Sequence, residues 1–525
     1  MHQLPLLDLV VIILYLLGMI WVGVHFARRS RNADQFTRAG GSIPGWAIGI
    51  SIYATFLSSN TFLGVPGKAF GSNWNAFVFS LSMPLAAWVA SRYFVPFYRR
   101  TGEVSAYTHL EHRFGAWART YAVVCFILTQ LARMGSIFFG IALTLQALTG
   151  FSIGTIMIVV GLCIILYTVM GGIEAVIWTE VVQAVIKTLG ALLIIYLIVA
   201  GMPGGLSHIM EIGRSNNKFS LGSFSPNLTQ PGFWVILLYG FFINLNNFGM
   251  DQNYVQRYHA ADSPKAAVRS IWLCVGIYIP ASLLFFFIGS CLFAYYQADP
   301  GMLAIVKEQA ARERLPLHAT QMQIDQLAAT LRPGDYGDKV MPHFIVTHVP
   351  AGISGLIIAA ILSAAMSTIS SGMNASATVF LEDIYGRYFR RQATGKQRMQ
   401  VLYIGTVVFG LLGMITGLAM TGTASILDIW WELSGIFAAG MLGIFLLGIF
   451  SRRTGNHAAM IAATIGILVI AWMSLSPRMP ATLGLLKNPF DKNMVIVIGT
   501  LSIFLVGVLL RSGSKARFPD ISRQP

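Results

Sequence analysis

Charged residues are scarce in this sequence. Asp, Glu, Lys and Arg make up 11% of the 525 residues, hydrophobic residues make up 55%, and the mean hydropathy is +0.66. Soluble domains carry about 25% charged residues, so this composition excludes an ordinary soluble protein. We therefore expect a polytopic membrane protein with the lipid bilayer as its main partner.

Cysteine and the motifs of enzymes are scarce too. The four cysteines, Cys125, Cys163, Cys274 and Cys291, lie far apart in apolar runs. None has the Cys-x-x-Cys spacing of a metal or redox site, and neither a phosphate-binding loop nor a nucleophile elbow occurs. These absences argue against an enzyme and against an organic cofactor.

The net charge of +15 comes largely from short basic loops between apolar runs. Such loops mark the cytoplasmic side of a membrane protein, so the charge predicts orientation and gives no reason to expect a nucleic-acid partner. The clusters that contain Arg28, Arg99, Arg257 and Arg387 alternate along the chain. They place the amino terminus outside and the carboxyl terminus in the cytoplasm, in the inner membrane of a bacterium.

Thirteen apolar runs are long enough to cross about 30 Å of hydrocarbon as helices. They cover residues 7–27, 46–70, 74–98, 117–149, 154–171, 174–202, 231–254, 270–297, 343–385, 399–421, 425–451, 456–476 and 493–511. Arginines follow the first run where a cleavage site would be expected, so this run is predicted to remain as a helix. Segments 203–230 and 298–341 are expected outside the membrane, the second with a surface helix near Thr320 to Leu331.

Polar and helix-breaking residues interrupt two of these runs. In 46–70, Ser58-Ser59-Asn60-Thr61 is followed by Gly64 and Pro66, and in 231–254 three asparagines lie between Tyr239 and Gly249. Two interrupted runs, five helices apart, predict two inverted repeats of five helices with a binding site at mid-membrane. The expected domains are the first helix with its basic loop (1–45), the first repeat (46–202), an outer loop (203–230), the second repeat (231–451) with an outer lid loop (298–341), and two additional helices with a short tail (452–525).

Four hydroxyls lie in the middle of one long apolar run. Ser367, Thr368, Ser370 and Ser371 follow the spacing i, i+1, i+3 and i+4, which forms two adjoining pairs on a helix surface. Sodium and other hard cations bind neutral oxygen ligands, which a helix offers as hydroxyls or freed carbonyls. The alternative is that these small residues only allow another helix to approach closely.

Three segments resemble a known family. They are Ala54-Thr-x-Leu57-Ser58-Ser59, then Gly171-Gly172-Ile-Glu-Ala-Val-Ile-Trp178-Thr179, and Ser367 to Asn374 followed by Phe380-x-x-Asp383-Ile-Tyr385. In these the chain resembles the sodium/solute symporter family, and it looks most like the bacterial sodium-coupled sialic acid transporters. The resemblance covers nearly the whole chain and implies an all-α LeuT-type fold with Na⁺ as the coupling ion.

The resemblance also implies ligands for sodium. The main site would consist of the backbone carbonyls of Ala54, Leu57 and Ala364 and the hydroxyls of Ser367 and Thr368. A second site, seen in some members, would use Glu180, Ser367, Ser370 and Ser371. Glu180 replaces the aspartate usual in the family, so this second site is displaced or absent, or Glu180 only extends to water at the helix end.

Lys187 is a second departure, because the sialic acid transporters carry an aliphatic residue at the matching position. It lies two turns beyond Glu180 on the same helix face. Its ammonium group either points to the main sodium site and stands in for the cation, as a buried lysine permits, or pairs with Glu180, or extends to water.

Arg133 lies about 24 Å into its expected helix, near the middle of the run. A guanidinium there needs a partner, and its planar fork fits a carboxylate. In the family resemblance this position holds the substrate carboxylate; the alternative is a structural ion pair. The substrate-binding residues predicted by the resemblance and by position are Arg133, Phe56, Ser58, Asn60, Thr61, Ala76, Ser80 and Gln130.

The function predicted from the sequence is sodium-coupled import of a small organic solute by alternating access. The arginine favours an anionic substrate, such as an acidic sugar, with sialic acid first. The alternative is a proton-coupled or uncoupled carrier that uses Glu180 and Lys187. A sensor is a further rival, and the short tail from Ser512 to Pro525 argues against it. We expect the chain to function as a monomer.

Overall fold

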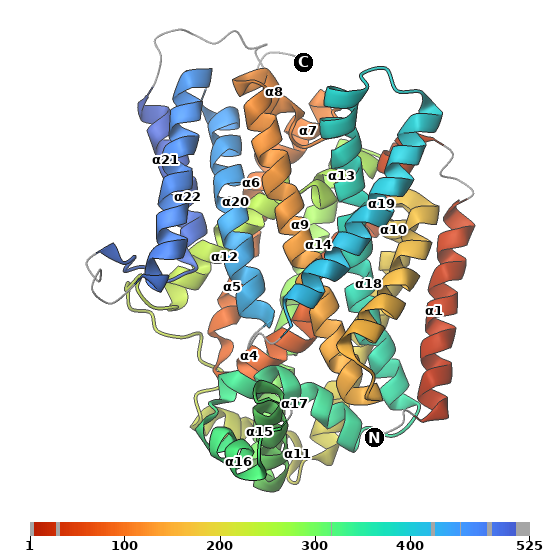
Figure 1. Cartoon of the computed structure of the whole chain (residues 1–525), viewed down its shortest axis with the longest axis vertical. Helices are drawn as coiled ribbons and strands as arrows, with labels where there is room; N and C mark the ends of the chain where they lie inside the picture. The colour runs from red at the N-terminus through yellow and green to blue at the C-terminus, as the bar shows by residue number, and fades with distance from the viewer. Residues whose placement is uncertain are drawn as a thin grey trace.

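The computed structural model describes residues 5–27, 32–316, 318–421, 426–451, 453–479 and 486–510, and these fold into a bundle of helices (Figure 1). The long helices are α1 (Leu6–Ala27), α3 (Gly45–Phe56), α9 (Ala116–Thr149), α10 (Ile153–Gly201), α12 (Phe233–Met250), α14 (Pro264–Ala298), α17 (Pro333–His348), α18 (Ile353–Val379), α19 (Gly395–Ala419), α20 (Ile426–Phe450), α21 (Asn456–Leu475) and α22 (Met494–Leu509). The shorter ones are α2 (Ala33–Arg38), η1 (Ala39–Gly41), η2 (Asn60–Gly64), α4 (Val65–Gly71), η3 (Trp74–Phe77), α5 (Val78–Leu81), α6 (Met83–Val89), η4 (Ala90–Phe94), α7 (Val95–Thr101), α8 (Thr108–Phe114), α11 (Gly205–Ser215), α13 (Gln252–Ala260), α15 (Pro300–Arg314), α16 (Gln321–Thr330), η5 (Phe380–Phe389) and η6 (Ser476–Arg478). Across these ranges the only β-pairing is one isolated bridge, between Ile43 and Ala261.

The predicted count of thirteen spans is not confirmed. In the described residues ten helices are long and apolar enough to cross a membrane, or eleven if the bent pair around residues 57–59 is one span. One reason is that α10 is assigned as a single helix of 49 residues, although Gly172 breaks it with φ 59° at the predicted boundary. Another is that α22 has 16 residues and is therefore about 24 Å long, which is less than the thickness of the hydrocarbon.

The run predicted at 343–385 begins differently in the structure. Its first residues belong to α17, and α18 begins only at Ile353, after Pro350 and Gly352, whose φ is +88°. Asp8 of α1 accepts hydrogen bonds from the backbone N–H groups of Gly352 (2.6 Å) and Gly355 (2.8 Å). The first N–H groups of a helix have no partner within it, so this buried carboxylate caps α18 and attaches α1 to the bundle.

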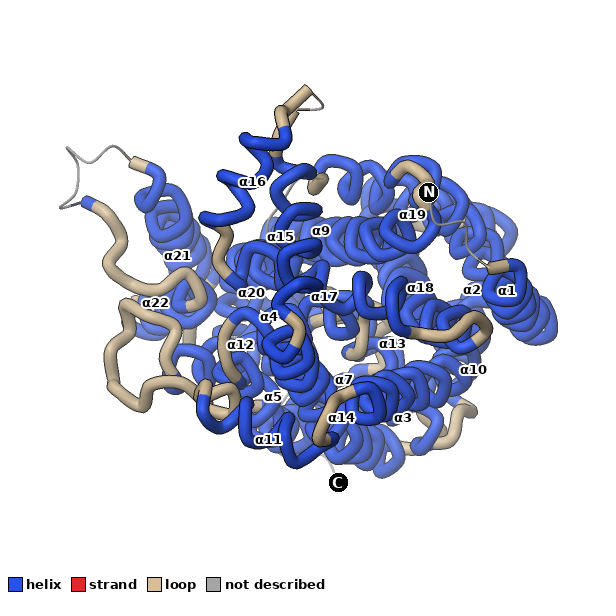
Figure 2. Tube along the Cα trace, turned by 90° about the horizontal axis from the view of Figure 1, so that it is seen from below, coloured by secondary structure: helices blue, strands red, loops and turns tan. Residues whose placement is uncertain are grey.

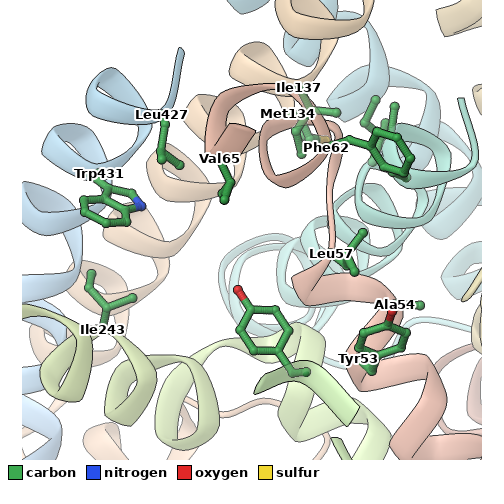
Figure 3. Packing of buried hydrophobic residues seen from close by; sticks show 14 of the residues in the cluster. Tyr53, Ala54, Leu57, Phe62, Val65, Met134, Ile137, Ile243, Leu427 and Trp431 are labelled. Carbon is green, nitrogen blue, oxygen red and sulfur yellow. The ribbon is translucent and has the colours of Figure 1, made fainter. Parts of the chain in front are cut away.

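The first predicted interruption is present. The helix α3 ends at Phe56, and the chain continues into η2 and α4 at an angle of 58°. Figure 3 shows the non-helical chain at Leu57 between α3 and η2, with Phe62 and Val65 beyond this break. The hydroxyl and amide side chains of residues 58–61 favour this break because they compete for backbone hydrogen bonds.

The second interruption lies later than predicted. The helix α12 is unbroken through its asparagines to Met250, and the chain breaks at Asp251, with ψ at 116°. The Asp251 side chain accepts a hydrogen bond from the backbone N–H of Asn253 at 2.9 Å, which caps the start of α13. The carboxylate therefore decides where the helix breaks.

The segments predicted outside the membrane form helices of 10 to 16 residues, and the last of them, α17, continues into the next predicted span. Figures 1 and 2 show α11, α15, α16 and α17 gathered at one end of the bundle. The surface helix predicted near Thr320 to Leu331 is α16, and a capping box at Thr320 and Gln323 begins it.

Glycines bring α4 close to its neighbours. A Cβ atom on Gly289 of α14 would lie 2.7 Å from the Cβ of Ala69 and 2.9 Å from the Cα of Pro66. On α17, a Cβ atom on Gly337 would lie 3.0 Å from the carbonyl carbon of Gly67. Because these approaches leave no room for a methyl group, α4 is held tightly between α14 and α17.

This packing leads to a stability prediction. We expect Gly289→Ala to lower the free energy of unfolding by about 1–3 kcal/mol, because the added methyl group overpacks the contact with α4. Gly276→Ala is the matched control on the same helix, where an added Cβ atom meets nothing within 4 Å. Alanine favours helices over glycine, so the control is expected to be neutral or stabilising. Thermal unfolding midpoints in detergent measure both, and equal losses would contradict the close packing.

Candidate functional site: a broken helix, two cationic side chains and a cavity

The end of α3 leaves four backbone carbonyls without partners in the helix, those of Ala54, Thr55, Phe56 and Leu57. Such carbonyls carry the negative end of the helix dipole and favour a cation. Two of them are satisfied by hydroxyls, because Thr368 donates to Thr55 at 3.2 Å and Thr61 donates to Phe56 at 3.4 Å.

The carbonyls of Ala54 and Leu57 receive the ammonium group of Lys187. Its Nζ donates to the Ala54 oxygen at 2.7 Å, to the Leu57 oxygen at 2.9 Å and to the Ser367 hydroxyl at 2.9 Å. An ammonium group has three donors, so all three are used. The side chain is fully buried and comes from α10, which packs against both α3 and α18.

All five residues predicted for the main sodium site lie in this cluster. The Ser367 hydroxyl donates to the carbonyls of Ala54 and Ala364, both at 3.2 Å, and Thr368 also donates to Ala364, at 3.4 Å. The oxygen set therefore fits a cation. Three of its five members already bind the Lys187 ammonium group, however, and a second cation about 4 Å away costs about 4 kcal/mol at an effective dielectric constant of 20. Sodium does not fit beside this side chain.

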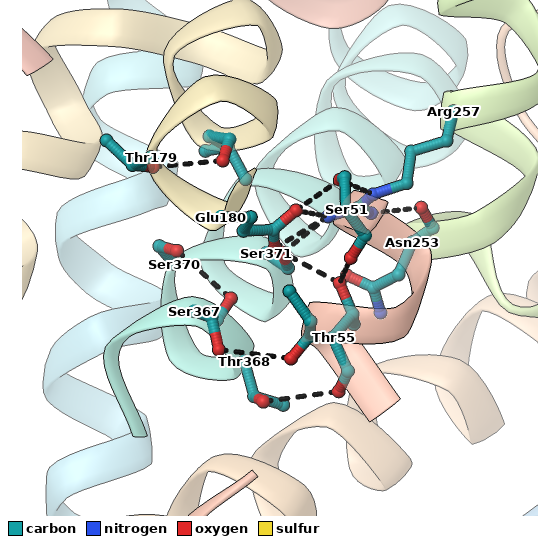
Figure 4. A network of polar contacts seen from close by, with 12 residues as sticks. Ser51, Thr55, Thr179, Glu180, Asn253, Arg257, Ser367, Thr368, Ser370 and Ser371 are labelled. Atoms are coloured by element: carbon teal, nitrogen blue, oxygen red, sulfur yellow. Dashed lines mark hydrogen bonds and ion pairs between the residues drawn. The ribbon is translucent and has the colours of Figure 1, made fainter. Parts of the chain in front are cut away.

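Glu180 does not reach water at the helix end, nor does it pair directly with Lys187. It forms a buried ion pair with Arg257 of α13, whose Nη2 donates to both carboxylate oxygens at 2.8 and 2.7 Å (Figure 4). Both side chains are fully buried. The hydroxyls of Ser51, Thr55 and Ser371 also donate to the Glu180 carboxylate.

The residues predicted for the second sodium site are thus divided. Glu180 and Ser371 lie in the ion-pair network, where Arg257 also donates to the Ser371 hydroxyl at 2.7 Å. Ser367 belongs to the Lys187 cluster, and Ser370 donates to the Ser367 carbonyl at 3.1 Å. The prediction that Arg257 lies in a loop is wrong, because it belongs to α13 and its side chain is buried against Ser51 of α3 and Ser371 of α18.

A cavity adjoins the broken helix, and its empty volume is about 740 Å³ including the part open to solvent. Seven of the eight residues predicted to bind substrate line it: Phe56, Ser58, Asn60, Thr61, Ala76, Ser80 and Arg133. Gln130 is the exception: it is fully buried, and it donates to Asp251 at 3.4 Å. Figure 3 shows Leu427, Trp431 and Ile243, which also line the cavity, across from Val65.

Arg133 is held in place by two neighbours. One terminal nitrogen donates to Asp251 at 3.1 Å, and the guanidinium carbon lies 5.1 Å from the ring centroid of Trp430. The sequence left two roles open for Arg133, a structural ion pair and a ligand of the substrate. Both are compatible with the structure, because Arg133 pairs with Asp251 and also lines the cavity.

The sequence reasoning missed three residues of this site. Asp251 and Arg257 lie four and ten residues beyond Asn247, the last of the asparagines that indicated the second interruption, and Trp430 comes from α20. A lone acidic residue at the end of an apolar run was a usable signal for Asp251. No local pattern identified the partner of Glu180, which is 77 positions away in the chain.

The model of the Sodium:solute symporter family matches residues 36–466. The chain belongs to this family. The sodium/sialic acid symporter NanT of Aliivibrio fischeri is 32% identical to this chain over 513 residues. The match covers 96% of this chain and 92% of that protein. The sodium/sialic acid symporter SiaT of Proteus mirabilis is 33% identical over 518 residues, covering 97% and 95%.

One solved structure is similar to this chain over nearly the whole length of both proteins. It is a Na⁺-coupled sialic acid symporter in a substrate-bound outward-open state, for which a novel Na⁺ site is described. The TM-score is 0.82 at 30% identity, and the match covers 96% of this chain and 97% of that one. The LeuT-type transporter fold expected from the sequence is therefore confirmed, as is a membrane transporter rather than an enzyme.

Proposed function

We propose that this member of the sodium:solute symporter family carries a small organic anion, an acidic sugar such as sialic acid, across the inner membrane of a bacterium by alternating access. The observation that carries the proposal is the position of Arg133 in the wall of a cavity beside the broken helix.

The other polar groups of the cavity suit a sugar. Asn60 donates through its amide nitrogen to Ser136 at 2.8 Å, while its carbonyl oxygen is buried and has no partner among the described residues. Ser58 and Thr61 line the same wall, and Ser80 and Ser282 share a hydrogen bond of 2.7 Å on another. Buried polar atoms without partners are costly, so the Asn60 oxygen is suited to accept a hydrogen bond from a hydroxyl of a solute.

The sequence leaves two candidates for the coupling mode, sodium coupling and a proton-coupled or uncoupled carrier, and a different observation supports each. The relatives are named as sodium symporters, which supports sodium as the coupling ion here. The three hydrogen bonds of the Lys187 ammonium group favour the second candidate, a proton-coupled or uncoupled carrier, because they use the oxygens predicted for the main sodium ion.

The proposal is tested by counterflow, which needs no ion gradient. Proteoliposomes preloaded with unlabelled sialic acid are expected to accumulate external labelled sialic acid at least about tenfold above liposomes without protein. Other acidic sugars are expected to compete, and the neutral N-acetylmannosamine is not, because it lacks the carboxylate for Arg133. Absence of counterflow with sialic acid and with every acidic sugar tested would overturn the proposed substrate class.

A further inference from the structure

We propose that Lys187 supplies a covalently attached cation at the main ion site, so that this carrier neither binds sodium at its two predicted sites nor depends on it. The inference rests on the proposed carrier function only for its consequence in transport. Its structural basis is the short contacts of the ammonium group with Ala54, Leu57 and Ser367.

The ammonium group performs the task of an ion at this site. It binds the carbonyls at the end of α3 and the hydroxyl of Ser367 on α18, and so it ties the broken helix to its partner helix. An ammonium group presents one positive charge to oxygen atoms at nearly the same place as a monovalent cation would. The site is thus built for a cation that the chain itself provides.

The acidic residue on the same face of α10 as Lys187 is already occupied. The Lys187 side chain is fully buried, and Glu180, the acidic residue two turns earlier on α10, is bound by Arg257 and three hydroxyls. A buried charge without hydrogen bonds is strongly disfavoured. The ammonium group therefore stays on the α3 carbonyls and excludes sodium.

Glu180 and Ser371, two of the ligands predicted for the second sodium ion, are likewise bonded to a cationic side chain of the protein itself. The carboxylate of Glu180, which would be its charged ligand, is neutralised by Arg257, and Arg257 also binds Ser51 at 2.7 Å and Ser371 at 2.7 Å. Together Glu180, Arg257 and Lys187 carry one net positive charge. That is the charge which a single bound sodium ion would have brought.

The experiment measures sodium binding directly and needs no substrate. Thermal midpoints of the purified full-length protein are recorded against increasing NaCl, with choline chloride keeping the ionic strength constant and KCl as the second cation. A ligand that binds the folded state raises its stability in a saturable way. The variants are Lys187→Ala, Lys187→Ala with Ser367→Ala, and Lys265→Ala, an exposed lysine of α14 that controls for loss of charge.

The intact protein and Lys265→Ala are expected to give the same curve in all three salts. Lys187→Ala is expected to gain a saturable, sodium-specific rise of several degrees, which the added Ser367→Ala removes. A sodium-specific rise in the intact protein would overturn the proposal, and so would a folded Lys187→Ala without a response to sodium. If Lys187→Ala does not fold, the curves of the intact protein alone test the proposal: a sodium-specific rise overturns it, and identical curves in the three salts support it. Because no solute is used, a wrong substrate class leaves this result unchanged.

Discussion

Arg133→Gln is expected to lower the apparent affinity for sialic acid in counterflow by about 30-fold to several thousand-fold. Removing one partner of a buried, hydrogen-bonded charge pair costs about 2–5 kcal/mol, and each 1.4 kcal/mol is about a factor of ten. The guanidinium lies in the cavity wall, over Trp430, and is the charged group best placed for a carboxylate. Concentration dependence of the counterflow rate measures the effect.

A double variant separates binding from structure. Arg133→Gln leaves the Asp251 carboxylate buried without its ion pair, so part of the loss could reflect the altered fold. Adding Asp251→Asn removes that unpaired charge. If Arg133 binds the solute, the double variant folds better and still fails to bind. Recovery of affinity in the double variant would instead make Arg133 a structural residue only.

Arg257→Met is expected to destabilise the protein by about 3–5 kcal/mol, because it leaves the Glu180 carboxylate buried without a counter-charge. We expect a fall of several degrees in the thermal midpoint and a lower yield of monodisperse protein in detergent. Arg269→Met is the matched control, since Arg269 is an exposed arginine in the next helix, α14.

Combining Arg257→Met with Glu180→Gln tests the reason for the loss. Replacing both members of a buried ion pair costs less than breaking it, so the double variant is expected to regain most of the lost stability. If the double variant is no more stable than Arg257→Met alone, packing of the arginine side chain, and not its charge, holds α13 in place.

Much of the site could be predicted because its signals are local. The hydroxyls of α18 follow helical spacing, and residues 54–61 combine carbonyls freed by a helix break with short polar side chains. These segments needed only the approach of two helices to become one cluster. For the same reason seven of eight predicted cavity residues line one cavity.

The remaining features depend on distances that no local pattern contains. In the sequence, Arg257 looks like one more basic residue of a loop. In the structure, the break at Asp251 begins α13, and this helix brings Arg257 to Glu180. For Lys187, the helical period predicted the face of α10 on which it lies. It did not predict whether the ammonium group binds at the main sodium site, pairs with Glu180 or extends to water. The packing of α10 against α3 and α18 makes that choice, because it brings the ammonium group to the end of the broken helix.

The covalent attachment of Lys187 also bears on the membrane voltage. A bound sodium ion leaves the protein in every cycle and carries its charge across, whereas a lysine ammonium group stays in the protein. The charge that crosses is then that of the solute alone, and each negative charge entering a cell works against about 2.3 kcal/mol per 100 mV of inside-negative potential. Such a protein would exchange one acidic solute for another, electroneutrally, more readily than it would concentrate either.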